Sequence, residues 1–312
     1  MKKEKEKKLY NLEENKKCEE VIKGIEKLSI EYKKILNSEE YILGSKIKNY
    51  KEMLKKGQFG KIFKKLLFNS NRHNKTLKTA LETNNYSSYF VDKKIVVYTS
   101  IFGRYDSIIE PLFKPDNIEY VIITDQDIPN DSIWNKIELD ESILKNKNNI
   151  EKNRFCKMFP EMFFKEYDYS IYVDGNVFIT SDLSPLIETL DIFPISMHRH
   201  KNRTCVYQEI EACIEKGKEN KDALLRHREL LKNNKVPENN GLLEATVIAR
   251  KHNDELCKKI MNEWWNEFTL YSKRDQISLI DVLWKNNISI DKVATMGNNT
   301  FLNSLFIIIP HK

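Results

Sequence analysis

Residues 167–176 of the chain predict a buried strand with a carboxylate at its end. The segment reads Tyr-Asp-Tyr-Ser-Ile-Tyr-Val-Asp-Gly-Asn, and its aromatic and β-branched residues stop abruptly at Asp174, Gly175 and Asn176. Aromatic and β-branched residues favour strands, whereas Asp, Gly and Asn favour turns. A strand that ends in this way holds an acid at the carboxyl edge of its sheet, where open α/β folds bind ligands. Taken alone, the tripeptide is explained better by a simple turn.

Other stretches have the composition of strands and helices, and together they predict a mixed α/β sheet flanked by helices. Apolar residues typical of strands are concentrated in four further segments, namely 94–100, 120–125, 193–197 and 241–250. Helical patterns are found in three, namely 153–164, 254–268 and 277–284. The 312 residues, 40% of them hydrophobic, suffice for one substantial domain with an appendage.

The first 90 residues differ from the rest in charge, and we predict that they form a basic helical extension to a main domain of residues 91–312. They carry 22 of the 52 basic and 12 of the 46 acidic residues, a net charge of +10, which leaves −4 for the remainder. This distribution argues against a nucleic-acid enzyme with a basic channel. It permits contact with anionic lipid or a partner, and a helical arm of this length also permits a homodimer. The amphipathic run 59–68 predicts either a membrane-surface helix or, preferably, a helix packed on the main domain.

Several features predict a cytoplasmic protein, with the basic arm available for contact with the inner face of the membrane. There is no run of about 18 apolar residues, and the N-terminal stretch lacks the apolar core of a secretory signal. The five cysteines are dispersed without CxxC spacing, which predicts reduced thiols rather than a disulfide framework or a zinc site.

Asp174 and two basic residues upstream suggest a site for a nucleotide-sugar diphosphate. Such a donor is doubly charged, and a divalent cation such as Mn²⁺ or Mg²⁺ held by carboxylates would neutralise it. Asp174 is the expected ligand, with the side-chain carbonyl of Asn176 as a weaker second. Arg154 and Lys157 lie in the helical pattern before this strand and could reach a diphosphate, although lysines on helices are usually solvated.

A basic cluster at residues 198–203 is the second candidate. His198 could bind a metal or a substrate hydroxyl and Arg203 could bind phosphate, while the alternative is a solvated basic loop. Tyr207 and Glu209 follow closely and favour the functional interpretation slightly.

Two further acids are candidates for acceptor binding or for general-base catalysis. Glu244 lies in the strand-like segment 241–250, and an exposed surface position is equally expected for it. Asp275 and Gln276 begin a helical pattern, where they could bind acceptor hydroxyls or simply accompany Ser272 as a helix cap.

The order of these motifs resembles the glycosyltransferase-like family once called domain of unknown function 616, which includes plant proteins implicated in mucilage and pollen-tube wall formation. The resemblance covers roughly residues 93–290. It is carried by the following motifs in order: residues 101–106, Arg154 with Lys157, residues 167–176, residues 198–209, residues 241–244, Trp264 with Trp265, and residues 272–278.

The resemblance implies a GT-A-like, Rossmann-like fold and transfer of a sugar from a nucleotide diphosphate. The donor would bind residues after three strands and on one helix: Phe102, Gly103, Arg104, Tyr105, Asp106, Asp125, Arg154, Lys157, Asp174, Gly175 and Asn176. Arg104 stands where the family commonly has a second glycine. The acceptor would contact Glu244, Trp264 or Trp265, and Asp275. A looser similarity to glycosyltransferase family 8 makes His311 a candidate metal ligand.

The sequence thus predicts a bacterial-type glycosyltransferase that uses a glycan or glycolipid acceptor in surface polysaccharide synthesis, such as that of capsule or lipopolysaccharide. Inversion at the anomeric carbon would need a base, Asp275 or Glu244, whereas retention could use the leaving phosphate. The alternative is a non-catalytic nucleotide- or carbohydrate-binding protein on a degenerate transferase fold, because the second acid of an Asp-x-Asp signature is missing. A third hypothesis is that the basic arm serves as an adaptor.

Overall fold

The computed structural model describes residues 93–311, apart from residues 113 and 298. The predicted basic extension, its amphipathic run 59–68 and Cys18 lie outside these residues. Among the described residues, no helix is long and apolar enough to cross a membrane. The four cysteines in this part of the chain are free and buried, at positions 156, 205, 213 and 257.

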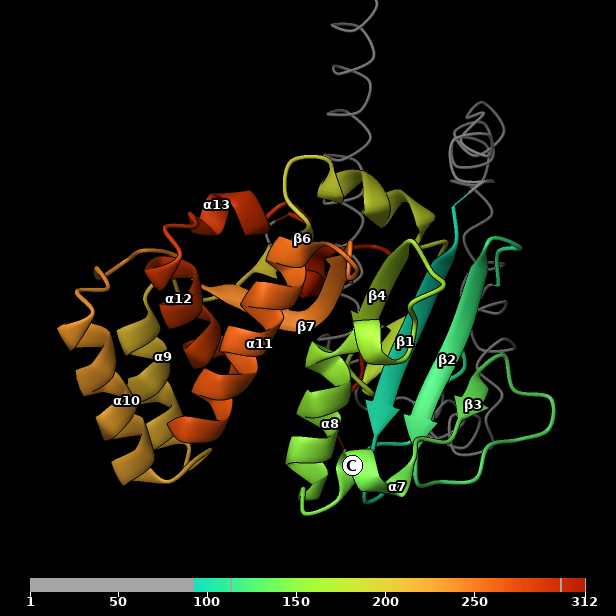
Figure 1. The fold of residues 1–312 in the computed structure, drawn as a ribbon, viewed down its shortest axis with the longest axis horizontal. Coiled ribbons are helices and arrows are strands. Elements are labelled where there is room, and N and C mark those ends of the chain that lie inside the picture. Colours follow the sequence, from blue (N-terminus) through green and yellow to red (C-terminus); the bar gives the residue numbers. More distant parts are fainter. Residues whose placement is uncertain (1–92, 113, 298, 312) are drawn as a thin grey trace, which may run out of the picture. The chain divides into compact units, whose positions relative to one another are not determined.

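A mixed sheet forms the centre of the described residues, and its six strands lie in the order β3-β2-β1-β4-β7-β6 (Figure 1). The first four strands of this order are parallel, whereas β7 is antiparallel to both β4 and β6. The strands confirm the predicted α/β sheet, and their bounds are β1 Ile95–Ile101, β2 Ile118–Thr124, β3 Asn135–Ile137, β4 Tyr169–Val173, β6 Ile195–Arg199 and β7 Leu243–Arg250.

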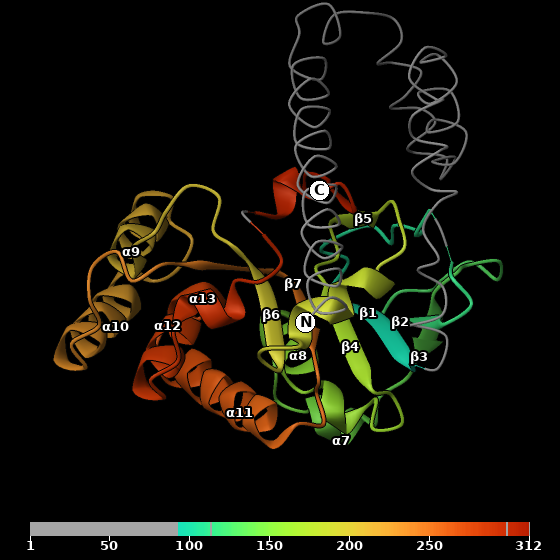
Figure 2. The same ribbon diagram turned by 90° about the horizontal axis from the view of Figure 1, so that it is seen from above.

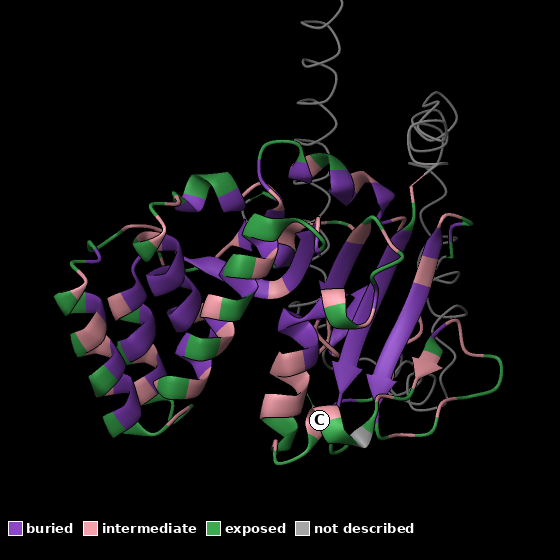
Figure 3. Cartoon of the chain, in the orientation of Figure 1, coloured by how far each residue is buried: buried purple, intermediate pink, exposed green. Residues whose placement is uncertain are grey.

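The central strands are buried on both faces, which explains their nearly continuous apolar sequences (Figure 3). Successive side chains of a strand point to opposite faces, so Val96 and Tyr98 enter one core while Ile95 and Val97 enter the other. The sheet therefore separates two hydrophobic clusters.

Helices lie on the side of the sheet that holds Tyr98, some of them against the sheet and others farther out (Figures 1 and 2). Their bounds are α7 Glu141–Leu144, α8 Asn149–Met158, α9 Val206–Glu215, α10 Lys221–Asn233, α11 Glu255–Leu270, α12 Asp275–Lys285 and α13 Ile290–Val293. The other cluster includes residues of a 3₁₀ helix, Ser184–Leu190, and of a two-stranded sheet formed by β5, Val177–Ile179, and β8, Phe306–Ile308.

Helix α8 begins and ends earlier than the predicted helix 153–164. The Asn148 side chain accepts a hydrogen bond from the Glu151 amide, and the Glu151 carboxylate accepts one from the Asn148 amide, so a capping box starts the helix at Asn149. Pro160 has no N–H and disfavours helical backbone at the residue before it, so α8 stops at Met158 and a short 3₁₀ helix, Pro160–Met162, follows.

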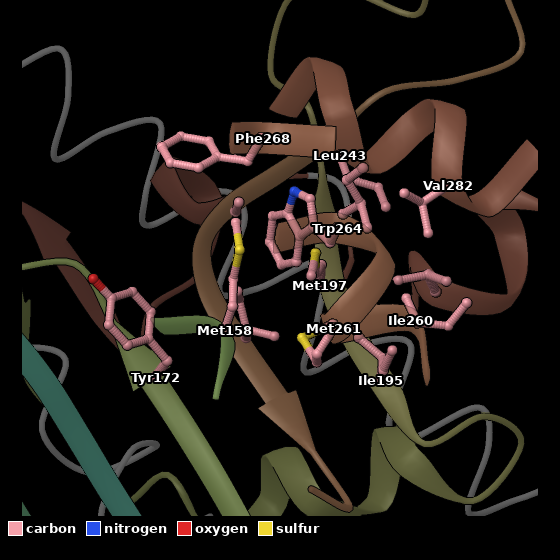
Figure 4. Packing of buried hydrophobic residues seen from close by; sticks show 14 of the residues in the cluster. Met158, Tyr172, Ile195, Met197, Leu243, Ile260, Met261, Trp264, Phe268 and Val282 are labelled. Atoms are coloured by element: carbon pink, nitrogen blue, oxygen red, sulfur yellow. The ribbon is translucent and has the colours of Figure 1, made fainter. Parts of the chain in front are cut away.

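Trp264 lies at the centre of the helix-covered core, among Met158, Met197 and Met261 (Figure 4). It has no exposed surface, and its indole N–H donates to the Asp275 carbonyl at 2.8 Å. The indole thereby connects α11 to the start of α12, which carries a candidate site residue.

We expect Trp264→Ala to lower the free energy of unfolding by about 3–5 kcal/mol, because it removes a large buried side chain and its hydrogen bond. Urea denaturation would measure the loss. Leu270→Ala, in the same helix but 73% exposed, is the control and should change stability by less than about 0.5 kcal/mol. Equal effects of the two substitutions would contradict this account of the core.

Candidate functional site

The carboxyl ends of the parallel strands β1 and β4 lie side by side at one edge of the sheet. The chain leaves β1 for β2 and β3 on one side and returns to β4 on the other side, which makes this position the topological switch point of the sheet. Open α/β sheets bind ligands at such points. Residues 102–106 follow β1 and residues 174–176 follow β4, so two predicted donor-binding segments meet here.

The loop after β1 has an unusual backbone that depends on glycine. Gly103 and Arg104 both have positive φ, 68° and 56°. A Cβ atom at Gly103 would lie 2.1 Å from the Asn149 side-chain nitrogen, so the Asn149 side chain would have to move to admit any larger residue. The Gly103 amide donates to both oxygens of Asp125, at 2.9 and 3.2 Å. Asp125 therefore shapes this loop, and its predicted contact with the donor stays a prediction.

A second acid stands beside the Asp174 turn, although it comes from the other loop. Asp106 follows β1, and a Cβ atom at Gly175 would lie 3.2 Å from its Oδ2 and 2.8 Å from the Ile101 side chain. The glycine is thus required by the close approach of the two loops. Asp106 thus brings a second carboxylate to the Asp174 turn.

His311 joins the same two loops from the far end of the chain. Its Nδ1 lies 2.9 Å from Asp106 Oδ1, and its Nε2 lies 3.5 Å from the Asn176 side-chain nitrogen. The Asn176 amide group donates to the Ile309 carbonyl, and the Ile309 amide donates to the Asn176 carbonyl, both at 2.9 Å. The pairing of β5 with β8 carries this end of the chain there.

Aromatic residues of the loop after β1 differ in exposure. Phe102 is buried, whereas Tyr105 is 65% exposed. The centroid of the Tyr105 ring lies 5.1 Å from that of the His311 ring. Tyr105 therefore presents an open aromatic surface next to the site.

A buried ion cluster connects the Asp174 turn to α8 and to the first residue of α12. Lys157 on α8 is 1% exposed, and its Nζ lies 2.9 Å from Asp275 Oδ2 and 3.3 Å from Asp174 Oδ1. Arg154, one turn earlier, places Nε 2.9 Å from the same Asp275 oxygen. Lys157 is therefore not the solvated lysine usually expected on a helix.

The charges of this cluster fix the ionisation of Asp275. Burial alone would raise its pKa, but Arg154, Lys157 and Arg274 together hold the pKa of this carboxyl well below its usual range. Burial also opposes the charge of Arg154, yet Asp275 and Asp174 raise the pKa of its guanidinium. A general base works best with a pKa near the working pH, so the ion pairs of Asp275 argue against this role, and the predicted base stays a prediction. Ser272 does not cap α12 either, because its hydroxyl pairs with His227 at 2.8 Å.

Glu244 is neither an exposed strand residue nor a free base. It is 4% exposed, and its carboxylate oxygens accept the amides of Lys201, at 3.0 Å, and of Thr300, at 2.9 Å. The expectation of an exposed strand residue is therefore wrong, because the carboxylate connects two backbone segments, while the predicted role of Glu244 toward the acceptor stays a prediction. His198 is opposite Glu244 in the β6–β7 pairing and is fully buried, which lowers the pKa of its imidazole to about 4.

The other predicted acceptor and phosphate residues have contacts that hold the fold. Glu209 is 1% exposed and pairs with Arg203 at 2.5 Å, and the Tyr207 hydroxyl donates to the Val236 carbonyl at 2.7 Å. The Trp265 ring packs on Phe155, with centroids 5.4 Å apart. Gln276 is half-buried beside Asp275. Substrate contacts of these residues stay predictions.

Sequence reasoning missed Asn153 and Tyr98. The Asn153 side chain donates to the Ser100 carbonyl at 2.6 Å and lies 3.3 Å from the Tyr172 hydroxyl, so it fixes α8 to the ends of β1 and β4. The Tyr98 hydroxyl donates to the Lys157 carbonyl at 3.1 Å. The spacing of Asn153 four residues before Lys157 was the available signal, because it places both on one helix face.

A hard divalent cation fits the chemistry of this edge, although the protein side chains alone do not encircle one. Among the described residues, no three His, Cys, Asp or Glu side chains converge as metal ligands. The Asp174 side chain is 27% exposed, and beside its turn His311 lies within 3.5 Å of both Asp106 and the Asn176 side chain. Oxygen-rich sets completed by substrate phosphates suit Mg²⁺ and Mn²⁺.

Comparisons with known proteins agree with the resemblance drawn from the motifs. The family described as TOD1/MUCI70, glycosyltransferase-like domain, matches residues 68–311. No curated protein matches the sequence. Among the solved structures that match is the apo structure of the WbbM bifunctional glycosyltransferase, with 11% sequence identity and a TM-score of 0.35. That match covers 65% of this chain and 38% of the other.

We expect Asp275→Asn to lower the free energy of unfolding at pH 7 by about 3 kcal/mol, because it leaves Arg154 and Lys157 without their shared anion. The folded-state pKa of Asp275 lies below its ordinary value of 3.8, so its contribution is complete above pH 4 and is lost as the pH falls further. The difference between wild type and variant should therefore shrink below pH 4. Denaturation at a series of pH values measures it.

Asp291→Asn is the control for this prediction. Asp291 pairs with Arg199 but its side chain is 75% exposed, so its removal should cost less than about 1 kcal/mol. A difference for Asp275→Asn that stays constant down to pH 2 would show that the cluster does not hold Asp275 ionised.

Proposed function

The chain belongs to the TOD1/MUCI70 glycosyltransferase-like family, and from this premise we propose that it moves a sugar from a nucleotide-diphosphate donor to a glycan or glycolipid acceptor. The observation that carries the proposal is the meeting of the Asp174 carboxylate with the cations of α8 at the switch point of the sheet. These groups supply both signs of charge at the edge where open α/β sheets bind nucleotides.

The cations of the cluster suit a diphosphate. Three cations, Arg154, Lys157 and Arg274, lie near Asp275, and the neighbouring anions are the two carboxylates of Asp275 and Asp174. The cluster therefore carries more positive than negative charge. Arg154 is the more accessible cation, since 22% of its side chain is exposed against 1% for Lys157. A guanidinium binds phosphate oxygens in pairs, so Arg154 is the proposed direct contact and Lys157 a fixed charge behind it.

A divalent cation, Mn²⁺ or Mg²⁺, completes the proposed donor site. Asp174 would hold it together with the side-chain carbonyl oxygen of Asn176, and Asp106 and His311 are the proposed further ligands. When bound, such an ion neutralises charge that develops on the leaving diphosphate. The Asp106 carboxylate and the His311 ring support each other's position through their hydrogen bond.

The contacts of the two candidate bases favour retention at the anomeric carbon. In the proposed reaction the bond from that carbon to the diphosphate breaks, and the acceptor hydroxyl oxygen bonds to the carbon. Asp275 is paired with two cations and Glu244 accepts two backbone amides, so neither is free to take the hydroxyl proton. The leaving diphosphate oxygen is the remaining proton acceptor.

Surface polysaccharide synthesis, such as that of capsule or lipopolysaccharide, is the proposed setting. The alternative is a protein that binds nucleotides or carbohydrates without turnover, which the incomplete set of protein metal ligands favours. Calorimetry with UDP, GDP, ADP and CDP, followed by turnover assays with the matching nucleotide sugars, separates the two. Binding without hydrolysis or transfer across varied acceptors would support the alternative.

We expect Asp174→Asn to lower nucleotide-sugar hydrolysis in the presence of Mn²⁺ by about 100-fold or more, because the carboxylate at the diphosphate is lost. Product release by the purified protein measures the rate. Asp191→Asn, an exposed acid outside this site, should leave the rate unchanged. Hydrolysis by Asp174→Asn at the wild-type rate would show that the proposed site is wrong.

The metal ligands are tested without a donor. We expect Asp106→Asn and His311→Ala each to weaken Mn²⁺ binding by at least about tenfold, as measured by electron paramagnetic resonance of free Mn²⁺. Asp127→Asn, an exposed acid after β2, should not change it. Unchanged Mn²⁺ affinity in both site variants would remove Asp106 and His311 from the proposed ligand set.

A further inference from the structure

Arg250 is a buried cation that donates its hydrogen bonds to a carbonyl, a hydroxyl and a sulfur rather than to a carboxylate. The residue ends β7 and has no exposed surface. Its guanidinium donates to the Lys157 carbonyl and to the Tyr98 hydroxyl, both at 2.6 Å, and meets the Met261 sulfur at 3.4 Å. A buried charge is costly unless its surroundings stabilise it, so these contacts call for an explanation.

The charge of Arg250 faces the carboxyl end of α8 and also interacts with the nearby carboxylate of Glu161. The last carbonyls of a helix have no partner within the helix and carry the negative end of its dipole. Tyr98 completes the arrangement, because its hydroxyl lies 3.1 Å from the Lys157 carbonyl and 3.2 Å from the Cys156 carbonyl. Burial raises the pKa of Tyr98, which keeps its hydroxyl protonated as a donor. Arg250 and Tyr98 thus both donate hydrogen bonds to the backbone carbonyl of Lys157.

The side chain of Lys157 extends the other way, toward the site. Side chains of a helix tilt toward its N-terminus, and the N-terminal residue of α8, Asn149, lies against Gly103 at the carboxyl edge of the sheet. The Lys157 ammonium passes the Tyr172 ring, 5.1 Å from its centroid, and ends between Asp174 and Asp275. One residue therefore connects the contacts at the carboxyl end of α8 to the acids at the edge.

We propose that Arg250 and Tyr98 are positioning residues for Lys157, which fix its carbonyl so that its ammonium meets Asp174 and Asp275 at the donor diphosphate. The inference rests on the proposed function, because it supposes that the Lys157 ammonium helps to bind the donor diphosphate. Without these hydrogen bonds the end of α8 can shift, and the ammonium no longer reaches both carboxylates with the same geometry. Neither residue touches the donor itself.

A double-mutant cycle with Tyr98→Phe and Lys157→Met tests the inference. Calorimetry measures the affinity for UDP and GDP, and for inorganic pyrophosphate as a probe that has no base. We expect Tyr98→Phe to weaken binding by about fivefold in the wild-type background, the effect of one lost hydrogen bond. In the Lys157→Met background the same substitution should have no further effect on affinity, because Tyr98 acts through Lys157.

The free energy of unfolding is measured on the same proteins. A stability loss from Tyr98→Phe should persist in both backgrounds, which separates positioning from general weakening of the fold. Tyr120→Phe is the matched control, since Tyr120 is equally buried on the neighbouring strand and its hydroxyl has no hydrogen-bond partner among the residues that the structure describes. It should leave affinity unchanged. Lys157→Gln replaces Lys157→Met if the latter does not fold. Arg250→Lys should also weaken affinity in the wild-type background and have no further effect when Lys157 is substituted.

The outcomes distinguish this inference from the proposed function. If wild type binds none of the probes, the proposed function fails and the inference fails with it. If wild type binds and Tyr98→Phe weakens affinity by the same factor in both backgrounds, the proposed donor site stands and the positioning role is wrong. An effect of Tyr120→Phe equal to that of Tyr98→Phe would also overturn the positioning role.

Discussion

The buried ammonium of Lys157 is the interaction on which the candidate site depends. It lies between the carboxylates of Asp174, at the end of β4, and Asp275, at the start of α12. Two acids held this close in a buried setting would repel each other without a cation, and a lone buried cation would be equally costly. The ion cluster therefore requires α8, β4 and α12 to be in place together, and the site forms only with the complete fold.

The topology supplies what the local sequence lacks. Asp-Gly-Asn has one acid, yet the return of the chain to β4 beside β1 brings Asp106 against Gly175. The β5–β8 pairing then carries His311 to the same place. Charge at this edge is thus assembled from three distant segments, which explains how a turn with one carboxylate can still belong to a site for a charged ligand.

The strands and the position of Asp174 could be predicted from the sequence, because a buried strand and the turn after it are local patterns. The burial of Lys157 could not, since it depends on Asp275, 118 residues away. The same holds for Glu244, whose amide partners follow β6 and lie near the end of the chain. The limits of α8 were missed for another reason, because the capping box and Pro160 outweigh the helical pattern around them.

The missing space at Gly175 has a consequence for how this turn can vary. Any side chain there would meet Ile101 and Asp106, and Ile101 belongs to the neighbouring strand. Positions 101 and 175 are therefore not independent, since a larger residue at 175 becomes tolerable only after the residue at 101 has become smaller. The space between the ends of β1 and β4 thus requires glycine at position 175 of the Asp-Gly-Asn turn. This requirement does not depend on the side chains at positions 174 and 176.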